Sequence, residues 1–296
     1  MKQRTAAISV ASNATLILLK VIAGVLTGSV AILTEAVHSS VDLIASFVTL
    51  ISVRKAEEPA DEGHRYGHEK IENLAAGLEG LLILVGSAAI VVAAIRRLIV
   101  GGTTHDVGIG MAVIGCSAVA NLIVSRVIAR GGRETDSPAL MGDALHLATD
   151  ALSSIAVFVA LLLVDLTGAE WIDPVAALIV AAVIVVTGVR LIVRSGEVLV
   201  DQSLPPEETS AIGEVIGHFS SRGVVGFHEL RTRRAGSRRY VDVHIQFRKG
   251  MSLEEAHLLS HELQDAIVGR LGSADVLIHI EPEARLRPGQ APLRAG

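Results

Sequence analysis

Residues 139–164 read ALMGDALHLATDALSSIAVFVALLLV, a long stretch in which apolar and small residues predominate. A helix that crosses a membrane needs about 20 consecutive, mostly apolar residues, and this stretch is long enough. Five other stretches have the same character, and they span about 6–28, 30–53, 72–98, 107–129 and 171–194. The sequence therefore predicts a polytopic α-helical membrane protein with six transmembrane helices.

The apolar residues are unevenly distributed along the chain. Half of the 296 residues are hydrophobic and the mean hydropathy is +0.53, yet residues 201–284 have the mixed charges of a soluble domain. We expect a transmembrane domain over 1–200, a cytoplasmic domain over 201–284 and a disordered end over 285–296. The net charge of −5 argues against nucleic acid as a partner.

Lysine and arginine indicate the orientation, because cytoplasmic loops carry an excess of both. An even number of spans puts both termini on one side of the lipid bilayer. If that side is the cytoplasm, the outer ends of the spans hold only Arg96 and Arg97. The inner ends then hold Lys2, Arg4, Arg54, Lys55, Arg65, Lys70, Arg126, Arg130, Arg133, Arg190 and Arg194. We therefore expect both termini to be cytoplasmic.

The region after Val200 has the pattern of a small α+β domain. Its order is helix, strand, strand, helix and strand, over about 206–221, 224–234, 238–248, 252–271 and 274–282. The residues between the first two strands, Ala235 to Ser237, are typical of a hairpin turn. In YVDVHIQF (240–247), apolar and polar residues alternate, which indicates a strand with one buried face.

Two histidine–aspartate pairs lie inside predicted spans. His38 and Asp42, in AVHSSVDLIAS (36–46), are four residues apart, and so are His146 and Asp150. Positions i and i+4 share one face of a helix, and both pairs fall near the middle of their spans. Two imidazoles and two carboxylates are suited to tetrahedral Zn²⁺. The sequence predicts a metal site within the membrane.

The energetics of the bilayer favour this interpretation. A charged side chain at its centre costs about 2.5–3.5 kcal/mol on insertion scales, and a divalent cation would balance two carboxylates. Protons on the imidazoles would replace the cation when it leaves. The alternative is that each pair only forms hydrogen bonds between helices. The same two interpretations, ion path or interhelical bond, apply to Glu35, Glu79, Asn13 and Asn121.

Two further groups of potential metal ligands lie outside the spans. The loop PADEGHRYGHEK (59–70) contains Asp61, His64 and His68, although polar loops often hold scattered residues of these types. The C-terminal region contains His228, His244, His257, His279 and Glu281. Solvent-exposed surface histidines are the alternative interpretation there. Motifs of the types HExxH, GxSxG and the P-loop are missing from the sequence, so an enzyme has no support.

The sequence from about Thr5 to Glu283 resembles the cation diffusion facilitator family, close to its bacterial zinc/proton antiporters. The resemblance rests on LTEAVHSSVD (33–42), HRYGHEKIENLAA (64–76), LHLATD (145–150), VDQSLP (200–205) and FHELRTR (227–233). It implies a homodimer in the cell (inner) membrane, with a cytoplasmic domain of ferredoxin-like, metallochaperone-like form.

The resemblance also implies a role for each group of residues. His38, Asp42, His146 and Asp150 map onto the transport site, and Asp61, His64 and His68 onto the loop site of the bacterial members. The C-terminal set of His228, His244, His257, His279 and Glu281 maps onto a binuclear site. Lys70 and Asp201 map onto a charge pair that helps to join the subunits. In this family, histidine at the first transport position is associated with Zn²⁺ and Cd²⁺, and aspartate with a wider range of metals.

We therefore expect a secondary active transporter that exports Zn²⁺ from the cytoplasm in exchange for protons, by alternating access. An exporter of broader range, for Cd²⁺, Fe²⁺ or Mn²⁺, stays open as an alternative. So does a membrane metal sensor that does not transport, although a sensor has no need of four ligands in mid-membrane. An intramembrane metalloenzyme would need a general base beside the metal, and no motif supplies one.

Overall fold

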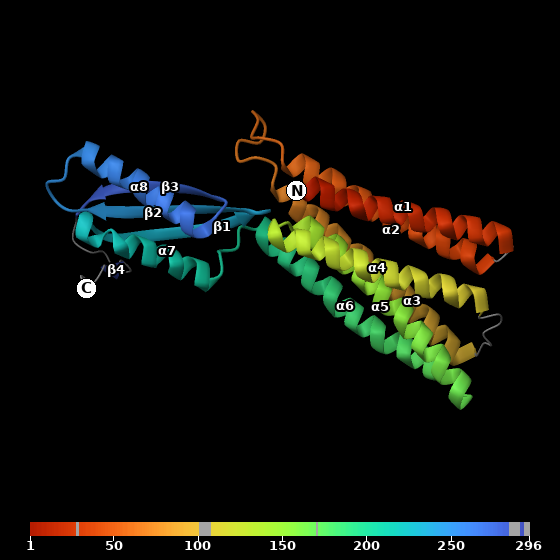
Figure 1. Cartoon of the computed structure of the whole chain (residues 1–296). Coiled ribbons are helices and arrows are strands. Elements are labelled where there is room, and N and C mark those ends of the chain that lie inside the picture. Colours follow the sequence, from red (N-terminus) through yellow and green to blue (C-terminus); the bar gives the residue numbers. More distant parts are fainter. Residues whose placement is uncertain (28–29, 101–107, 170, 284–290, 293–296) are drawn as a thin grey trace. The chain divides into compact units, whose positions relative to one another are not determined.

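The chain forms two compact units, Met1–Gly196 and Glu197–Gly296 (Figure 1). This computed structural model describes residues 1–27, 30–100, 108–169, 171–283 and 291–292. Within these ranges, side chains are not described at positions 27, 30–35, 37–38, 108–114, 161, 165 and 291–292. The boundary between the units lies four residues before the one expected from the sequence.

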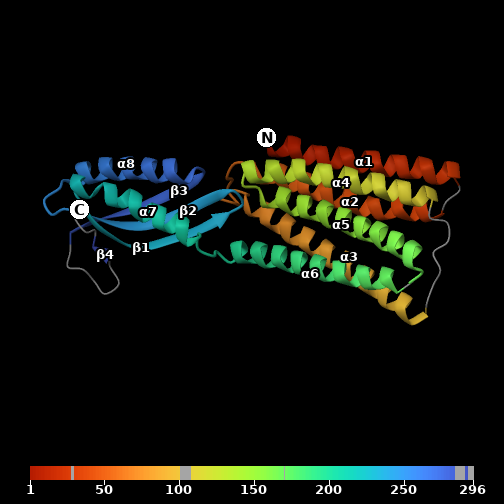
Figure 2. The same cartoon turned by 60° about the horizontal axis from the view of Figure 1, so that its bottom comes forward.

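The first unit consists of long helices that run side by side (Figures 1 and 2). They are α1 (Lys2–Thr27), α2 (Val30–Ala56), α3 (Lys70–Val100), α4 (Gly108–Glu134), α5 (Pro138–Thr167) and α6 (Ile172–Leu199). Each of them corresponds to one predicted span, with at most one residue of the span outside the helix, and most continue for several residues into polar sequence. Helices extend beyond the apolar stretch because the backbone hydrogen bonds continue wherever no residue interrupts them.

The surface of this unit is suited to lipid. Within the described residues, α1, α3, α5 and α6 are long and apolar enough to cross a membrane. Large apolar side chains are exposed on the outside of the helices, including Leu18, Phe47, Val92 and Leu162. So much exposed apolar surface is unusual for a soluble monomer, whereas the acyl chains of a bilayer would solvate it.

Small residues allow the helices to approach closely. One buried cluster contains residues from each of the five helices α1, α2, α3, α4 and α5. Its members are Ala6, Leu50, Val53, Ala75, Ile128, Ala139, Leu140, Ala144 and Leu147. Between α3 and α6, a Cβ on Gly80 would lie 3.1 Å from the carbonyl oxygen of Gly188, and a Cβ on Gly188 would lie 3.1 Å from that of Gly80. Close packing of this kind is what holds helices together in lipid, where the hydrophobic effect between them is lost.

The second unit is an α+β fold. Its elements are α7 (Pro206–His218), a 3-10 turn (Ser220–Arg222), β1 (Val224–Ala235), β2 (Arg238–Phe247), α8 (Leu253–Leu271), β3 (Ala274–Pro282) and β4 (Ala291–Pro292). The strand order is β3-β2-β1-β4, with β1 antiparallel to β2 and β3 parallel to β2. The other four predicted elements match within one residue at each end, while the predicted helix over 206–221 ends early, at His218.

Both helices of this unit cover the same face of the sheet. Val241, Val243 and Ile245 of β2 are buried in one cluster with residues of α7 and α8. Because successive side chains of a strand point to opposite faces, Asp242 and His244 lie on the face that the helices leave open. The helices therefore cover the hydrophobic core, and His244 lies on the open face of the sheet.

Part of the predicted disordered end is ordered. Ala291 and Pro292 pair with Phe227 and Gly226 of β1, so the expectation of disorder over 285–296 is wrong for these two residues. The physical reason is that the edge of β1 offers unpaired backbone groups to any nearby segment. Residues 284–290 and 293–296 lie outside the described part of the chain.

Candidate functional site

Helices α2 and α5 bring three of the predicted transport residues together. Asp42, His146 and Asp150 each offer a ligand atom within 4.8 Å of the others. Nε2 of His146 is 3.4 Å from Oδ1 of Asp42 and 3.6 Å from Oδ2 of Asp150. Asp42 and His146 are buried, and Asp150 is half-buried. His38 lies one turn before Asp42 in α2, but its side chain is outside the described part of the chain.

A further carboxylate approaches this cluster from α3. Oε2 of Glu79 is 3.8 Å from Nδ1 of His146, and only 1% of the Glu79 side chain is exposed. The other oxygen, Oε1, accepts a hydrogen bond of 3.0 Å from the hydroxyl of Thr49 in α2. The His146 ring is therefore flanked by carboxylates at both of its nitrogens.

Asp143 adds a third buried carboxylate, after Asp42 and Glu79, one helical turn before His146. Its Oδ1 accepts a hydrogen bond from Ser46 at 3.1 Å, and Ser46 itself contacts Ser9 at 2.9 Å and the amide of Asn13 at 2.7 Å. This polar network links α1, α2 and α5. Several carboxylates in a low-dielectric interior favour the presence of a cation.

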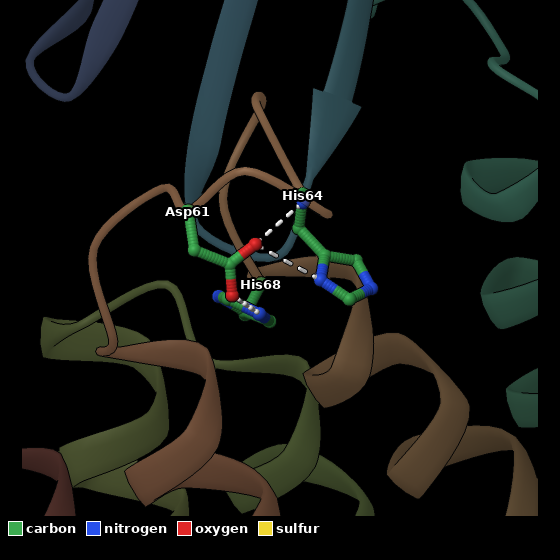
Figure 3. A group of neighbouring side chains, drawn as sticks. All are labelled: Asp61, His64 and His68. Atoms are coloured by element: carbon green, nitrogen blue, oxygen red, sulfur yellow. Dashed lines mark hydrogen bonds and ion pairs between the residues drawn. The ribbon is translucent and has the colours of Figure 1, made fainter.

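A second group of ligands lies in the loop between α2 and α3. Figure 3 shows the Asp61 carboxylate between the imidazoles of His64 and His68. Oδ1 of Asp61 is 3.3 Å from Nδ1 of His64, and Oδ2 is 3.3 Å from Nε2 of His68. The second contact is at ion-pair distance without the geometry of a hydrogen bond, so neither ring nitrogen of the buried His68 has a hydrogen-bond partner among the described residues.

The backbone of this loop shapes the group. The N–H of His64 donates to Oδ1 of Asp61 at 2.6 Å, and this bond is the main reason why the pKa of the Asp61 carboxyl is lowered. Gly67 has a φ of 88°, which glycine adopts without strain. An ionised carboxylate and two imidazoles are suitable ligands for Zn²⁺.

A third group lies on the open face of the C-terminal sheet. Oε2 of Glu281 is 2.8 Å from Nε2 of His228, and Oε1 is 2.9 Å from Nδ1 of His244. His279 is the register partner of His244, and its Nε2 is 3.7 Å from the same Oε1. The group thus draws on β1, β2 and β3. The hydrogen bonds from His228 and then His244 are the largest causes of the lowered pKa of Glu281.

A β-bulge brings another carboxylate to this group. The pairing of β1 with β2 shifts between His228 and Arg231, and Glu229 has a φ of 48°. This left-handed conformation is uncommon for residues other than glycine. Oε2 of Glu229 lies 3.5 Å from Nε2 of His244. The bulge therefore turns a side chain that would otherwise point to the helix-covered face toward the histidines.

His257 is separate from this group. It lies on α8, which packs against the opposite face of the sheet, and its Nε2 is 3.2 Å from that of His261. Of the five residues that the resemblance assigns to the C-terminal site, one chain thus assembles four. Lys70 belongs to the first compact unit and Asp201 to the second. The charge pair between these two residues therefore stays a prediction.

Comparison with known proteins identifies the family. The family model described as "Cation efflux transmembrane domain" matches residues 6–200, and the model described as "Cation efflux protein, cytoplasmic domain" matches residues 204–283. An uncharacterized transporter of Synechocystis sp. is 35% identical to this chain, over 89% of this chain and 85% of its own length. The chain belongs to the cation diffusion facilitator family.

Two further proteins are similar to this chain. The cation-efflux pump FieF of Serratia proteamaculans is 34% identical, over 90% of this chain and 88% of the pump. The metal-bound C-terminal domain of the CzcD transporter from Thermotoga maritima is 28% identical, with 26% of this chain and 87% of that domain covered and a TM-score of 0.24.

Membership of the cation diffusion facilitator family confirms several predictions. The chain is a membrane cation efflux transporter with a helical transmembrane domain and a C-terminal cytoplasmic α+β domain, and it is not an enzyme. Its three groups of ligands are consistent with a protein that handles metal ions.

Three of the residues that approach these groups are harder to identify from the sequence. Glu79 was one of several intramembrane polar residues with two interpretations. Asp143 was not singled out, although an acidic residue one turn before His146 on the same apolar helix is a signal in itself. Glu229 was also missed, because nothing in FHELRTR (227–233) indicates a β-bulge.

Proposed function

We propose that this chain exports Zn²⁺ from the cytoplasm in exchange for protons. Asp42, His146 and Asp150, together with His38, bind the cation in transit. The observation that carries the proposal is the convergence of two aspartates on the His146 imidazole inside a helical membrane domain. Such a group would be costly in lipid unless a cation or protons balanced its charge.

The chemistry of the ligands supports both the cargo and the counter-ion. Imidazole and carboxylate together suit Zn²⁺, whereas Mn²⁺ favours oxygen ligands alone. Histidine must be neutral to bind a metal, so loading of Zn²⁺ releases protons and protonation promotes its release. A site that alternates between the two faces of the membrane would thereby couple Zn²⁺ export to proton entry.

The remaining parts of the proposal concern assembly and regulation. We place both termini in the cytoplasm, because lysine and arginine are concentrated at that end of the spans. The transporter works as a homodimer, in which Lys70 and Asp201 help to hold the subunits together. The loop group and the strand group of the C-terminal domain bind Zn²⁺ as regulatory sites. His257 joins the latter only from a second subunit or after a movement of α8.

Sealed liposomes provide the test. The purified protein is reconstituted, Zn²⁺ is added outside, and internal Zn²⁺ and pH are followed with trapped dyes. We expect Zn²⁺ uptake to be accompanied by proton efflux. We also expect an imposed proton gradient to drive Zn²⁺ transport against the Zn²⁺ concentration gradient. Metal movement without proton movement would contradict antiport, and preference for Mn²⁺ or Fe²⁺ would contradict Zn²⁺ as the cargo. A sensor would show neither flux.

A further inference from the structure

Glu79 is a buried carboxylate that the proposed ligand set does not use. It lies in α3, whereas the transport residues lie in α2 and α5, and its side chain is 1% exposed. Its Oε2 has no hydrogen-bond partner among the described residues. A buried, unsatisfied carboxylate oxygen costs free energy, so a residue in this state calls for a functional explanation.

The unsatisfied oxygen of Glu79 faces an unsatisfied nitrogen. Nδ1 of His146 also lacks a hydrogen-bond partner in the described residues, and it is 3.8 Å from Oε2 of Glu79. The other ring nitrogen, Nε2, points to Asp42 and Asp150. The two nitrogens of His146 therefore face different partners: the cation ligands on one side and Glu79 on the other.

We propose that Glu79 is a positioning residue for transport: it accepts the Nδ1–H of His146 and so keeps the Nε2 lone pair directed at the cation. This inference rests on the proposed function of Asp42, His146 and Asp150 as the transport site. Histidines that bind metals commonly donate their second N–H to a carboxylate, which fixes the tautomer and the ring orientation. Glu79 has the place and the chemistry for that task.

Its surroundings hold Glu79 in position. The hydroxyl of Thr49 donates to Oε1 at 3.0 Å, which leaves Oε2 free for His146. Gly142 of α5 gives the side chain room, since a Cβ there would lie 3.2 Å from both Cβ and Cγ of Glu79. Oε2 of Glu79 and Nδ1 of His146 are 3.8 Å apart, and we expect them to approach to hydrogen-bond distance when the cation binds, because the last torsions of glutamate and histidine have broad minima.

The test compares an apolar variant with one that keeps the acceptor. Glu79→Leu removes the acceptor, and we expect its KM for Zn²⁺ in liposome uptake to rise about 10- to 100-fold, the usual effect of losing such a partner. Glu79→Gln keeps an amide oxygen and should show a much smaller rise. Mn²⁺ should compete better against Zn²⁺ in Glu79→Leu than in the wild type, because Mn²⁺ depends less on imidazole.

Glu72→Gln is the matched control. Glu72 is a completely buried carboxylate of the same helix, two turns away, and it pairs with Lys2 at 2.6 Å. We expect this variant to keep the wild-type KM and metal ranking. If Glu79→Leu behaves like the control, or if Glu79→Gln is as impaired as Glu79→Leu, the inference is wrong. Should Glu79→Leu fail to fold, Glu79→Ala takes its place with the same expectations.

One more variant separates this inference from the proposed function. Asp150→Ala is measured in the same series. If it transports Zn²⁺ normally, the transport site itself is misassigned. If it is inactive while the Glu79 variants keep the wild-type KM and metal ranking, the transport site stands and only the role of Glu79 is refuted.

Discussion

Nε2 of His146 lies 3.4 Å from Oδ1 of Asp42, although 104 positions separate the two residues in the chain. The contact exists because α2 and α5 pack together and both residues are buried at their interface. An imidazole between two carboxylates forms a partial set of metal ligands, and it makes the charge of this interface depend on whether a cation or protons occupy it.

Removing either aspartate should abolish transport. Asp42→Ala or Asp150→Ala leaves too few ligands and an unbalanced charge, so we expect Zn²⁺ uptake in liposomes to fall to background while the protein still folds. Asp136→Asn is the control, because it neutralises an exposed aspartate just before α5, and asparagine tolerates the backbone φ of 50° at that position. Near-normal uptake by both alanine variants would refute the assignment.

His38→Asp should change the selectivity. The substitution replaces a nitrogen ligand with a hard oxygen, which favours Mn²⁺ or Fe²⁺ relative to Zn²⁺. Competition uptake assays with pairs of metals measure the ranking. An unchanged order in this variant would mean that His38 does not contact the cation.

The loop group should bind one Zn²⁺ per chain. Asp61→Ala removes the carboxylate that contacts both imidazoles, and titration calorimetry of the full-length protein should then show one Zn²⁺ fewer per chain. Glu62→Ala changes the adjacent exposed carboxylate of the same loop and should keep the full stoichiometry. Equal stoichiometries for the two variants would identify the loop histidines as ordinary surface residues.

The C-terminal domain should gain stability from Zn²⁺. It has a hydrophobic core of its own, so the fragment Leu204–Glu283 is expected to fold. At Zn²⁺ concentrations 100-fold above Kd, binding adds about 2.7 kcal/mol to the free energy of unfolding and should also promote dimerisation.

Changing His244 and His279 together to Ala should remove this gain and leave some transport in the full-length protein. His218→Ala alters a histidine of α7 outside the group and should keep the gain. If Zn²⁺ changes neither the melting temperature nor the self-association of the fragment, the regulatory role is contradicted, even if the transport site stands.

The start of α8 should give the fragment an acid-sensitive element. Ser252 and Glu255 form a reciprocal capping box, and the backbone N–H of Ser252 is the main cause of the lowered pKa of Glu255. A lowered pKa in the folded state means that the stabilisation is present above the ordinary value of 4.5 and is lost as the pH falls below it.

Thermal melts of metal-free fragments check this expectation. Ser252→Ala should cost about 1 kcal/mol, or about 4–8 °C in Tm for a domain of this size. Glu255→Gln should melt below the wild type at pH 7, and the difference should shrink toward pH 3. A difference that is independent of pH would show that ionised Glu255 contributes nothing.

The sequence alone determined the features that depend on local spacing. Length and apolarity located the helices, since a span in lipid must satisfy its own backbone hydrogen bonds within one continuous segment. Alternation placed His244 on the polar face of β2, because side chains in a strand repeat every two residues. The i, i+4 spacing put His146 and Asp150 on one face of α5, because the side chains of a helix repeat about every 3.6 residues.

The tertiary structure decided which of these local features meet. Asp42 meets His146 because α2 packs beside α5, and Glu79 reaches the same ring from α3 beside Gly142, where a Cβ would lie 3.2 Å from the Glu79 side chain. His257 is set apart because α8 covers the face of the sheet opposite His244. Spacing within one element is fixed by backbone geometry, whereas contacts between elements depend on packing side chains that are distant in sequence, and no single stretch of sequence encodes them.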